Sequence, residues 1–303
     1  MTSAPAIIPG FLDMELLSRL PSLDLQARYL VEGFLTGLHR SPVRGHNVEF
    51  KEFRAYQPGD EPRTVDWKVY ARTDRLHVKV REEDTNLTAY VVVDNSASMS
   101  YRSAGAVMSK WEYARSVAAA LLVLLHRQRD AASLALAGRG LDVFIPPSLK
   151  GSELHRMMGA LHREADAPGG PLAGALDTVA QLARRRSLVF VISDFYEVPA
   201  ALDGPVGRLH YNYCEPVFMH VMDPRELDFD FDAPVLLQEL ETRGQMSVSP
   251  DLLRGEYLKR LNAHRAALRD FVCRYGGDYV LLRTDQAPVH GLGAYLARRK
   301  GML

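Results

Sequence analysis

The pattern of apolar positions divides the chain into two parts. From Leu87 onward, short apolar runs alternate with longer segments in which apolar residues recur every three or four positions, as in strands and helices. The predicted strands cover residues 90–93, 132–137, 141–145, 188–192, 217–222 and 279–282. The predicted helices cover residues 108–128, 153–163, 173–184, 252–275 and 292–300. This alternation predicts an α/β fold: a mainly parallel, Rossmann-like sheet with helices on both faces.

The part of the chain before Leu87 has a different texture. Residues 12–38 show helical spacing that Pro21 interrupts. From Arg44 to Glu83, charges of both signs interleave with aromatic and aliphatic residues, which indicates short strands or extended segments with too little aliphatic mass for a core of their own. We therefore expect residues 1–84 to form a helical and extended/β extension that packs on a main domain of residues 85–303.

Composition and charge exclude several classes of protein. The 303 residues contain 37 Lys plus Arg and 37 Asp plus Glu, so a nucleic-acid binder with a basic excess is not expected. Cys214 and Cys273 lie far apart and outside any CxxC pair, which argues against a disulfide framework. The longest apolar run, Val117 to Leu125, is too short for a membrane span. The N-terminus has no secretory signal pattern, so we expect a cytoplasmic protein.

The zero net charge is the sum of opposed regions. An acidic stretch follows Met222, and a basic portion extends from Arg254 to Lys300. Two such regions can meet different partner surfaces by electrostatic steering. The alternative is that charges at helical spacing form solvated faces.

Candidate chemistry gathers where two predicted strands end. Asp94 follows the run 90–93 and is followed by Ser96 and Ser98, while Asp194 follows the run 188–192. In a parallel sheet these strand ends reach the same edge, where ligands of such folds bind. One carboxylate and two hydroxyls on one loop, with a second acid nearby, are hard oxygen ligands suited to Mg²⁺ or Mn²⁺.

A simpler interpretation of the same residues remains open. Aspartate and serine at a strand-to-helix junction often serve as turn and cap residues that hold the first amides of the next helix. The position of Asp94 directly after a buried strand, together with the second strand that ends at Asp194, favours a metal site over this alternative.

Spaced motifs resemble known families. Asp94-x-Ser96-x-Ser98-Met99 after an apolar strand is similar to the metal-ion-dependent adhesion site of von Willebrand factor A-like domains. Upstream and downstream motifs resemble the bacterial family called domain of unknown function 58. They are Glu49-Phe50, Arg54-x-Tyr56-x-x-Gly59-Asp60-x-x-Arg63-x-x-Asp66-Trp67, Ala71-Arg72, Glu82 and Asp223-Pro224-Arg225-Glu226.

This resemblance implies a fold, a partner and a metal. The fold is von Willebrand A-like with an N-terminal extension, and the protein is a non-enzymatic adaptor that acts with a MoxR-type AAA+ ATPase. The implied cofactor is Mg²⁺ or Mn²⁺ at Asp94, Ser96, Ser98 and Asp194. One position departs from the pattern, because Pro171 follows Gly169-Gly170 where a threonine or serine ligand is expected. The site is therefore degenerate, with water in place of the hydroxyl, or it binds metal weakly or not at all.

The segment that contains the upstream motif offers a second candidate surface. Its arginine and aromatic residues are of the types enriched at interaction hot spots. The candidate partner-binding residues are Arg54, Tyr56, Arg63, Asp66 and Trp67. The favoured alternative is structural, with Arg63 paired to Asp66 and the aromatic side chains anchoring the extension on the sheet.

Two other functions stay open. A metal-dependent phosphohydrolase could use the same carboxylates, but aspartyl phosphatases place a second acid two residues after the nucleophile, where this chain has Ser96. A metal-free scaffold would account for Pro171 as a mark of a decayed site. No catalytic residue is predicted, and we expect a protein without enzymatic activity.

Overall fold

The structure is a computed structural model, and it divides into two units. The residues that it describes are 14–39, 53–55, 70, 72, 77–79, 87–165, 170–231, 235–238, 245–248 and 250–300. One unit comprises the chain up to Leu38 together with Leu87 to Leu303, and the other comprises His39 to Asn86. The stretch expected as a single N-terminal extension is thus shared between both units.

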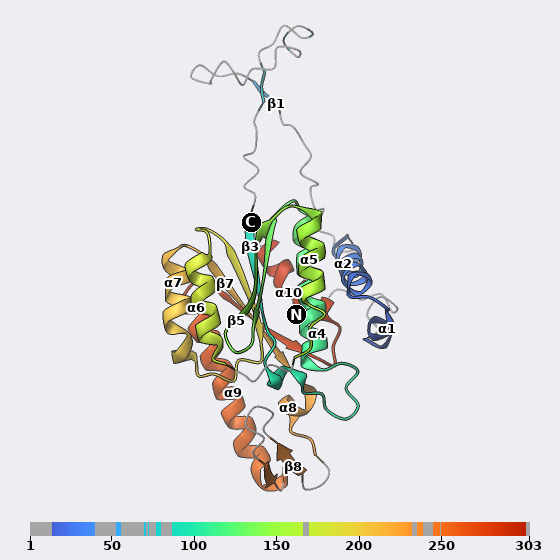
Figure 1. Ribbon diagram of the computed structural model, residues 1–303, viewed down its shortest axis with the longest axis vertical. Helices are drawn as coiled ribbons and strands as arrows, with labels where there is room; N and C mark the ends of the chain where they lie inside the picture. The colour runs from blue at the N-terminus through green and yellow to red at the C-terminus, as the bar shows by residue number, and fades with distance from the viewer. Residues whose placement is uncertain are drawn as a thin grey trace, which may run out of the picture. The chain divides into compact units, whose positions relative to one another are not determined.

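A six-stranded sheet forms the centre of the larger unit (Figure 1). Its strands are β3 (Thr88–Asp94), β4 (Ala131–Ala137), β5 (Leu141–Ser148), β6 (Leu188–Ser193), β7 (Glu215–Met222) and β10 (Asp278–Arg283). The spatial order is β10-β7-β6-β3-β4-β5, and only the edge strand β5 runs antiparallel to its neighbour. Counted within this sheet the order is 3-2-1-4-5-6, a doubly wound order whose direction reverses between β3 and β6.

Helices cover both faces of this sheet (Figure 1), as the alternating pattern predicts. One face packs against helices that share a core cluster with the strands, and the other face packs against a second set. The first set is α1 (Met14–Arg19), α2 (Leu23–His39), α4 (Lys110–Arg127), α5 (Gly151–Ala160) and α10 (Pro288–Lys300). The second set is α6 (Leu172–Leu182), α7 (Asp203–Tyr211) and α9 (Pro250–Arg274).

The continuous apolar run of β3 follows from this double cover. Val91 and Val93 lie in the core cluster of α4, whereas Tyr90 and Val92 lie in that of α6 and α7. Since successive side chains of a strand point to opposite faces, both faces of a central strand must be apolar. All residues of β3 from Ala89 to Asp94 are buried.

A capping box fixes the start of α4. The Ser109 hydroxyl accepts a hydrogen bond from the Glu112 amide at 3.1 Å, and the Glu112 carboxylate accepts from the Ser109 amide at 2.8 Å. The helix returns antiparallel to the strands, so its first residue, Lys110, lies at the carboxyl edge of the sheet. The expected helix over residues 108–128 is confirmed.

Several short elements were not expected from the sequence. They are η2 (Ala97–Ser100), η3 (Pro199–Leu202), α7, α8 (Pro224–Asp228), and the antiparallel pair β8 (Val235–Gln238) with β9 (Gln245–Val248). In the smaller unit, β1 (Phe53–Ala55) pairs antiparallel with β2 (His77–Lys79), in agreement with the short strands expected there. The sequence of α7 contains Gly204, Pro205 and Gly207, which weaken its helical signal.

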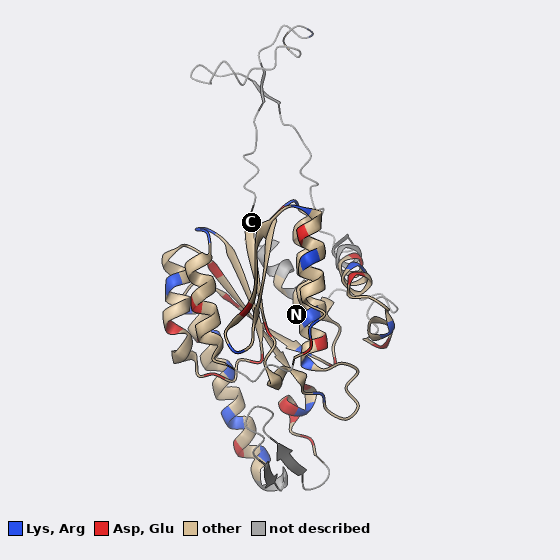
Figure 2. Ribbon diagram, in the orientation of Figure 1, with Lys and Arg blue, Asp and Glu red and all other residues tan. Residues whose placement is uncertain are grey.

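Among the described residues, the charged ones lie mainly on the helices and the loops (Figure 2). The acidic stretch and the basic portion of the chain form an ion pair where Arg283 lies 3.3 Å from Asp228, and Arg283 also lies 3.0 Å from Asp285. On α9, Arg260 pairs with Glu256 at 2.8 Å along an exposed face. These pairs fit the interpretation of these charges as solvated faces.

Candidate functional site

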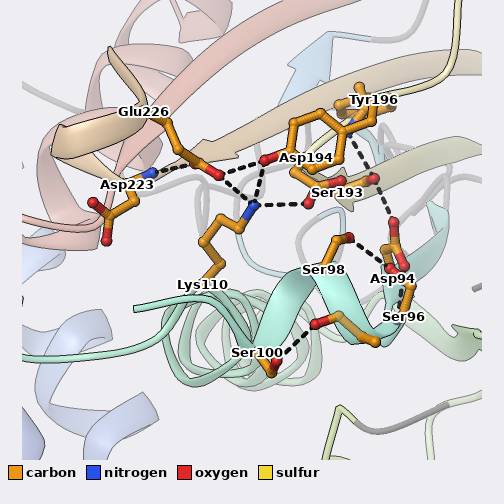
Figure 3. A network of polar contacts seen from close by, with 12 residues as sticks. Asp94, Ser96, Ser98, Ser100, Lys110, Ser193, Asp194, Tyr196, Asp223 and Glu226 are labelled. Carbon is orange, nitrogen blue, oxygen red and sulfur yellow. Dashed lines mark hydrogen bonds and ion pairs between the residues drawn. The ribbon is translucent and has the colours of Figure 1, made fainter. Parts of the chain in front are cut away.

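The loop that follows β3 brings one carboxylate and two hydroxyls together. Asp94 Oδ1 accepts a hydrogen bond from the Ser96 amide at 2.9 Å, and the hydroxyls of Ser96 and Ser98 lie 3.0 Å apart (Figure 3). All three residues are buried. The Asp94 bond is the turn contact of the simpler interpretation. Within the described chain, however, the Ser96 side chain makes no cap bond to η2 although it occupies the cap position.

The end of β6 lies beside this loop. Val93 and Ile192 are partners in the parallel ladder, so the next residue of each strand lies at the same edge. Ser193 Oγ donates to Asp94 Oδ2 at 2.6 Å, and the following residue, Asp194, is also buried. The structure therefore brings Asp94, Ser96, Ser98 and Asp194 to the point between β3 and β6 where the strand order reverses, which is where ligands bind in doubly wound folds.

A fully buried lysine, which sequence reasoning missed, connects Asp194 to a third strand end. Lys110 Nζ donates to Asp194 Oδ2 at 2.8 Å, to the Tyr196 hydroxyl at 3.0 Å and to Glu226 Oε1 at 2.9 Å (Figure 3). Its exposed fraction is 0%. Glu226 belongs to α8, which follows β7. The ammonium thus joins groups from α4, the β6 loop and α8 in one network.

Asp223 extends this network to the first loop. It caps α8 in a second capping box, in which its carboxylate accepts from the Arg225 amide and its own amide donates to Glu226 Oε2, each at 2.9 Å. Its other carboxylate oxygen accepts from the Ser103 amide at 3.0 Å. The loops after β3, β6 and β7 are therefore fixed relative to one another.

The two buried acids of the site, Asp94 and Asp194, differ in their electrostatic surroundings. Burial, and after it the charge of Asp194, raises the pKa of Asp94 to about 6, while hydrogen bonds from Ser193 and Ser96 oppose that shift. Burial acts to lower the pKa of Lys110, but Asp194 and Glu226, with Tyr196, raise it well above its ordinary value. Lys110 is therefore charged and compensates Asp194, whereas the hydrogen bonds of Asp94 come from the neutral groups of Ser96 and Ser193.

The four candidate ligands line one cleft of about 270 Å³ at the carboxyl edge of the sheet. They are Asp94, Ser96, Ser98 and Asp194. The other residues that line it are Gly170, Pro171, Leu172, Ser193, Phe195, Tyr196 and Glu197. Pro171 is the cap residue of α6, with neither a hydroxyl nor an amide hydrogen. The Glu197 carboxylate instead accepts hydrogen bonds from the first amides of the helix, those of Leu172 and Ala173. A carboxylate from the loop that follows β6 thus lies at the start of α6, where the sequence lacks the expected hydroxyl.

The donor set fits a hard divalent cation. Asp94 supplies a carboxylate with raised pKa, which a nearby positive charge would keep ionised, and Ser96 and Ser98 supply adjacent hydroxyl oxygens. The open cleft leaves room for water and for one further ligand. Among the described residues no three His, Cys, Asp or Glu side chains come close enough to hold a metal ion, so an ion here would depend on the serine hydroxyls and water.

One protein family matches most of this chain. The family model described as "Protein of unknown function DUF58" matches residues 52–267. The chain belongs to this family. An uncharacterized protein of Mycobacterium tuberculosis, Rv1480, is 30% identical to this DUF58 protein over 315 residues, which cover 100% of this chain and 98% of the relative.

Solved structures are similar to the sheet and its helices. One is an aerotolerance-related membrane protein from Bacteroides fragilis, with a TM-score of 0.46, 11% identity, and coverage of 72% of this chain and 100% of that one. Another is the SpRpn10 VWA domain, with a TM-score of 0.39, 12% identity, and coverage of 69% and 94%. The fold of this DUF58 protein is α/β, with a mainly parallel six-stranded sheet between two layers of helices, as the sequence predicts.

The expected location requires a correction. The Bacteroides protein is described as a membrane protein, and this description overturns the cytoplasmic location that the sequence suggested. Within the described ranges, no helix has the length and apolar character that a membrane crossing requires.

The second candidate surface falls mostly outside the described residues. Arg54 lies in β1 opposite Val78. Tyr56, Arg63, Asp66 and Trp67 lie outside the described residues, so their role as a partner-binding surface stays a prediction.

Some of the residues that sequence reasoning missed carry a readable signal. Ser193 directly precedes Asp194 at a strand end, and the spacing of Asp223 and Glu226 is that of a capping box. Lys110 has no comparable signal, because a lysine at the first position of a helix is ordinarily solvated.

Proposed function

We propose that this DUF58 protein is an adaptor that binds a protein partner through a divalent cation, Mg²⁺ or Mn²⁺, at the carboxyl edge of its sheet. The proposed ligands are Asp94, Ser96, Ser98 and Asp194. The observation that carries the proposal is the convergence of these side chains in one open cleft, where Asp94 has a raised pKa and two adjacent hydroxyls beside it. The ion would supply a Lewis-acidic position that accepts a carboxylate oxygen of the partner.

The residues of the chain have distinct parts in this function. Asp94 would hold the ion directly, with Ser193 and the Ser96 amide orienting its two oxygens. Ser96 and Ser98 would contribute hydroxyl oxygens. Lys110 holds Asp194 by one oxygen, Oδ2, and Asp194 also lines the cleft, where it would contribute to the ion site. Since the ion is held by few protein charges, it keeps affinity for an anionic ligand from outside.

A metal titration tests the site itself. We expect Mg²⁺ to bind the full chain in calorimetric titration, and Asp94→Asn to weaken that binding at least about tenfold because it removes the ionised ligand. Asp142→Asn, which changes an exposed aspartate of β5, is the matched control and should bind as the unaltered chain does. Equal Mg²⁺ affinity in the Asp94→Asn variant and the unaltered chain would show that Asp94 is not a ligand.

We further propose a MoxR-type AAA+ ATPase as the partner, since the resemblance of the family motifs implies it. The measurement is co-purification of the two proteins in the presence of Mg²⁺ and ATP. Because such ATPases need Mg²⁺ for their nucleotide, the Asp94→Asn variant at constant Mg²⁺ is a better comparison than a chelator. Retained binding of this variant would contradict metal-bridged docking.

A metal-free interaction surface is the second candidate function. The observation that favours it is the Lys110–Asp194 pair, in which a buried ammonium already compensates one of the two acids. Absence of heat with both Mg²⁺ and Mn²⁺, together with partner binding that survives Asp94→Asn, would support this candidate. Turnover of p-nitrophenyl phosphate with Mg²⁺ would instead support the phosphohydrolase, and we expect none.

A further inference from the structure

Two exposed apolar side chains lie on the loop that follows β6, whose residues Phe195, Tyr196 and Glu197 line the cleft. Tyr196 is 58% exposed and lines the cleft together with Asp94 and Asp194. Val198, two residues further along, is 64% exposed. Single exposed apolar residues are common on protein surfaces. Here the two residues flank Glu197 in the sequence, and Tyr196 and Glu197 both line the cleft. We refer to Tyr196 and Val198 together as the apolar rim.

Buried and partly buried charged groups hold the Tyr196 ring in place. Its hydroxyl accepts a hydrogen bond from Lys110 Nζ at 3.0 Å and donates to the Glu226 carboxylate. Lys110 Nζ also lies 4.7 Å from the centroid of the ring. Because Lys110 is fully buried and fixed by two acids, the exposed ring is already ordered in the free protein. An ordered aromatic side chain loses little conformational entropy when a partner covers it, which is the property of an interaction anchor.

The charge of the cleft limits which groups of a partner can bind there. Asp94, Asp194 and Glu197 make the cleft acidic, and only a bound cation would allow a partner carboxylate to enter it. A carboxylate alone identifies a partner poorly, since most protein surfaces carry acids. An apolar contact beside it would reject acidic segments that lack a matching side chain.

We propose that the partner presents a short segment in which an aspartate or glutamate is accompanied, within a few residues, by an aromatic or branched aliphatic side chain. The acid binds the metal ion held at Asp94, and the apolar side chain packs on the rim formed by Tyr196 and Val198. The specificity-determining residues are therefore Tyr196 and Val198. This inference rests on the metal-bridged docking proposed above. A single short segment makes both contacts because Tyr196 and Asp94 line the same cleft.

A displayed library of random peptides tests the inference with the full chain in millimolar Mg²⁺. We expect enriched peptides to carry an acid next to an apolar side chain. For a synthetic peptide of that kind, Val198→Ser and Tyr196→Ser should each weaken binding about tenfold, whereas Tyr196→Phe, which keeps the ring, should retain most of it. The matched control is Tyr211→Ser, since Tyr211 is 82% exposed at the end of α7, at the opposite edge of the sheet.

Val198→Ser keeps the test independent of folding. Val198 is exposed at the cap position of η3, where serine is a favoured residue. Failure to enrich any peptide, enriched peptides without an apolar residue near the acid, or unchanged affinity of the Val198→Ser variant would overturn the proposal. If peptides with the expected pair lose affinity in Val198→Ser but bind equally in chelator and to Asp94→Asn, the apolar rim stands and the metal bridge is wrong.

Discussion

Replacement of Lys110 by methionine is expected to lower the free energy of unfolding by about 3–5 kcal/mol. Lys110 Nζ lies within hydrogen-bond distance of Asp194, Tyr196 and Glu226, and the lysine side chain is fully buried. Methionine fills a similar volume but leaves the buried Asp194 carboxylate without its cationic partner. Removing one member of a buried ion pair costs more than the pair itself contributes, because the remaining charge stays desolvated. Urea unfolding followed by circular dichroism measures the change.

Two further variants separate this effect from a general loss of a lysine. Lys150→Met, at an exposed position before α5, should change the free energy of unfolding by less than about 0.5 kcal/mol. Adding Asp194→Asn to Lys110→Met should recover part of the loss, since the unpaired carboxylate is then gone. If Lys110→Met is as stable as Lys150→Met, the buried network is not a determinant of the fold.

Acidification is expected to lower the free energy of unfolding substantially, through His220 in β7. Burial, and after it the charges of His264, Arg265 and Lys110, lowers the pKa of His220 to about 3. In the unfolded chain the pKa of histidine is about 6.5, so the unfolded state takes up a proton where the folded state does not. The stability that the neutral ring contributes is complete above about pH 6.5 and is lost as the pH falls toward 3, with a loss of about 2 kcal/mol between pH 7 and pH 5.

The comparison of two histidine variants isolates this contribution. His220 Nδ1 lies 2.8 Å from the Tyr279 hydroxyl, and glutamine at this position can preserve a hydrogen bond without titrating. His220→Gln should therefore show a weaker loss of stability between pH 7 and pH 5 than the unaltered chain, as measured by urea unfolding at each pH. The exposed His155→Gln variant should keep the original pH dependence. An unchanged pH dependence in His220→Gln would contradict the shift.

Much of the candidate site follows from simple rules applied to the sequence. Asp94 ends one apolar strand and Asp194 directly follows another, and parallel strands bring their carboxyl ends to one edge. The serines follow Asp94 closely enough that any tight turn keeps them near its carboxylate. This is local chemistry on predictable elements, so the sequence is sufficient to predict the convergence.

The contact between Glu197 and the start of α6 was beyond such rules. Pro171 marks the loss of a hydroxyl ligand in the sequence, but the Glu197 carboxylate that contacts the start of α6 comes from another loop. Which side chain fills such a position depends on how two loops approach each other. That approach is determined by the packing of α6 on the sheet and has no local signature.

The sequence by itself determined the six strands of the central sheet, the longer helices between them and the edge at which the acids meet, because these depend on periodicity and on the direction of the chain. Only the tertiary structure decided that Lys110 is buried and that Ser193 lies 2.6 Å from Asp94. A buried charge is stable only when acids from separate elements surround it, and residues far apart in the chain supply them here. The raised pKa of Asp94 and the order of the Tyr196 ring also depend on contacts between residues far apart in the chain.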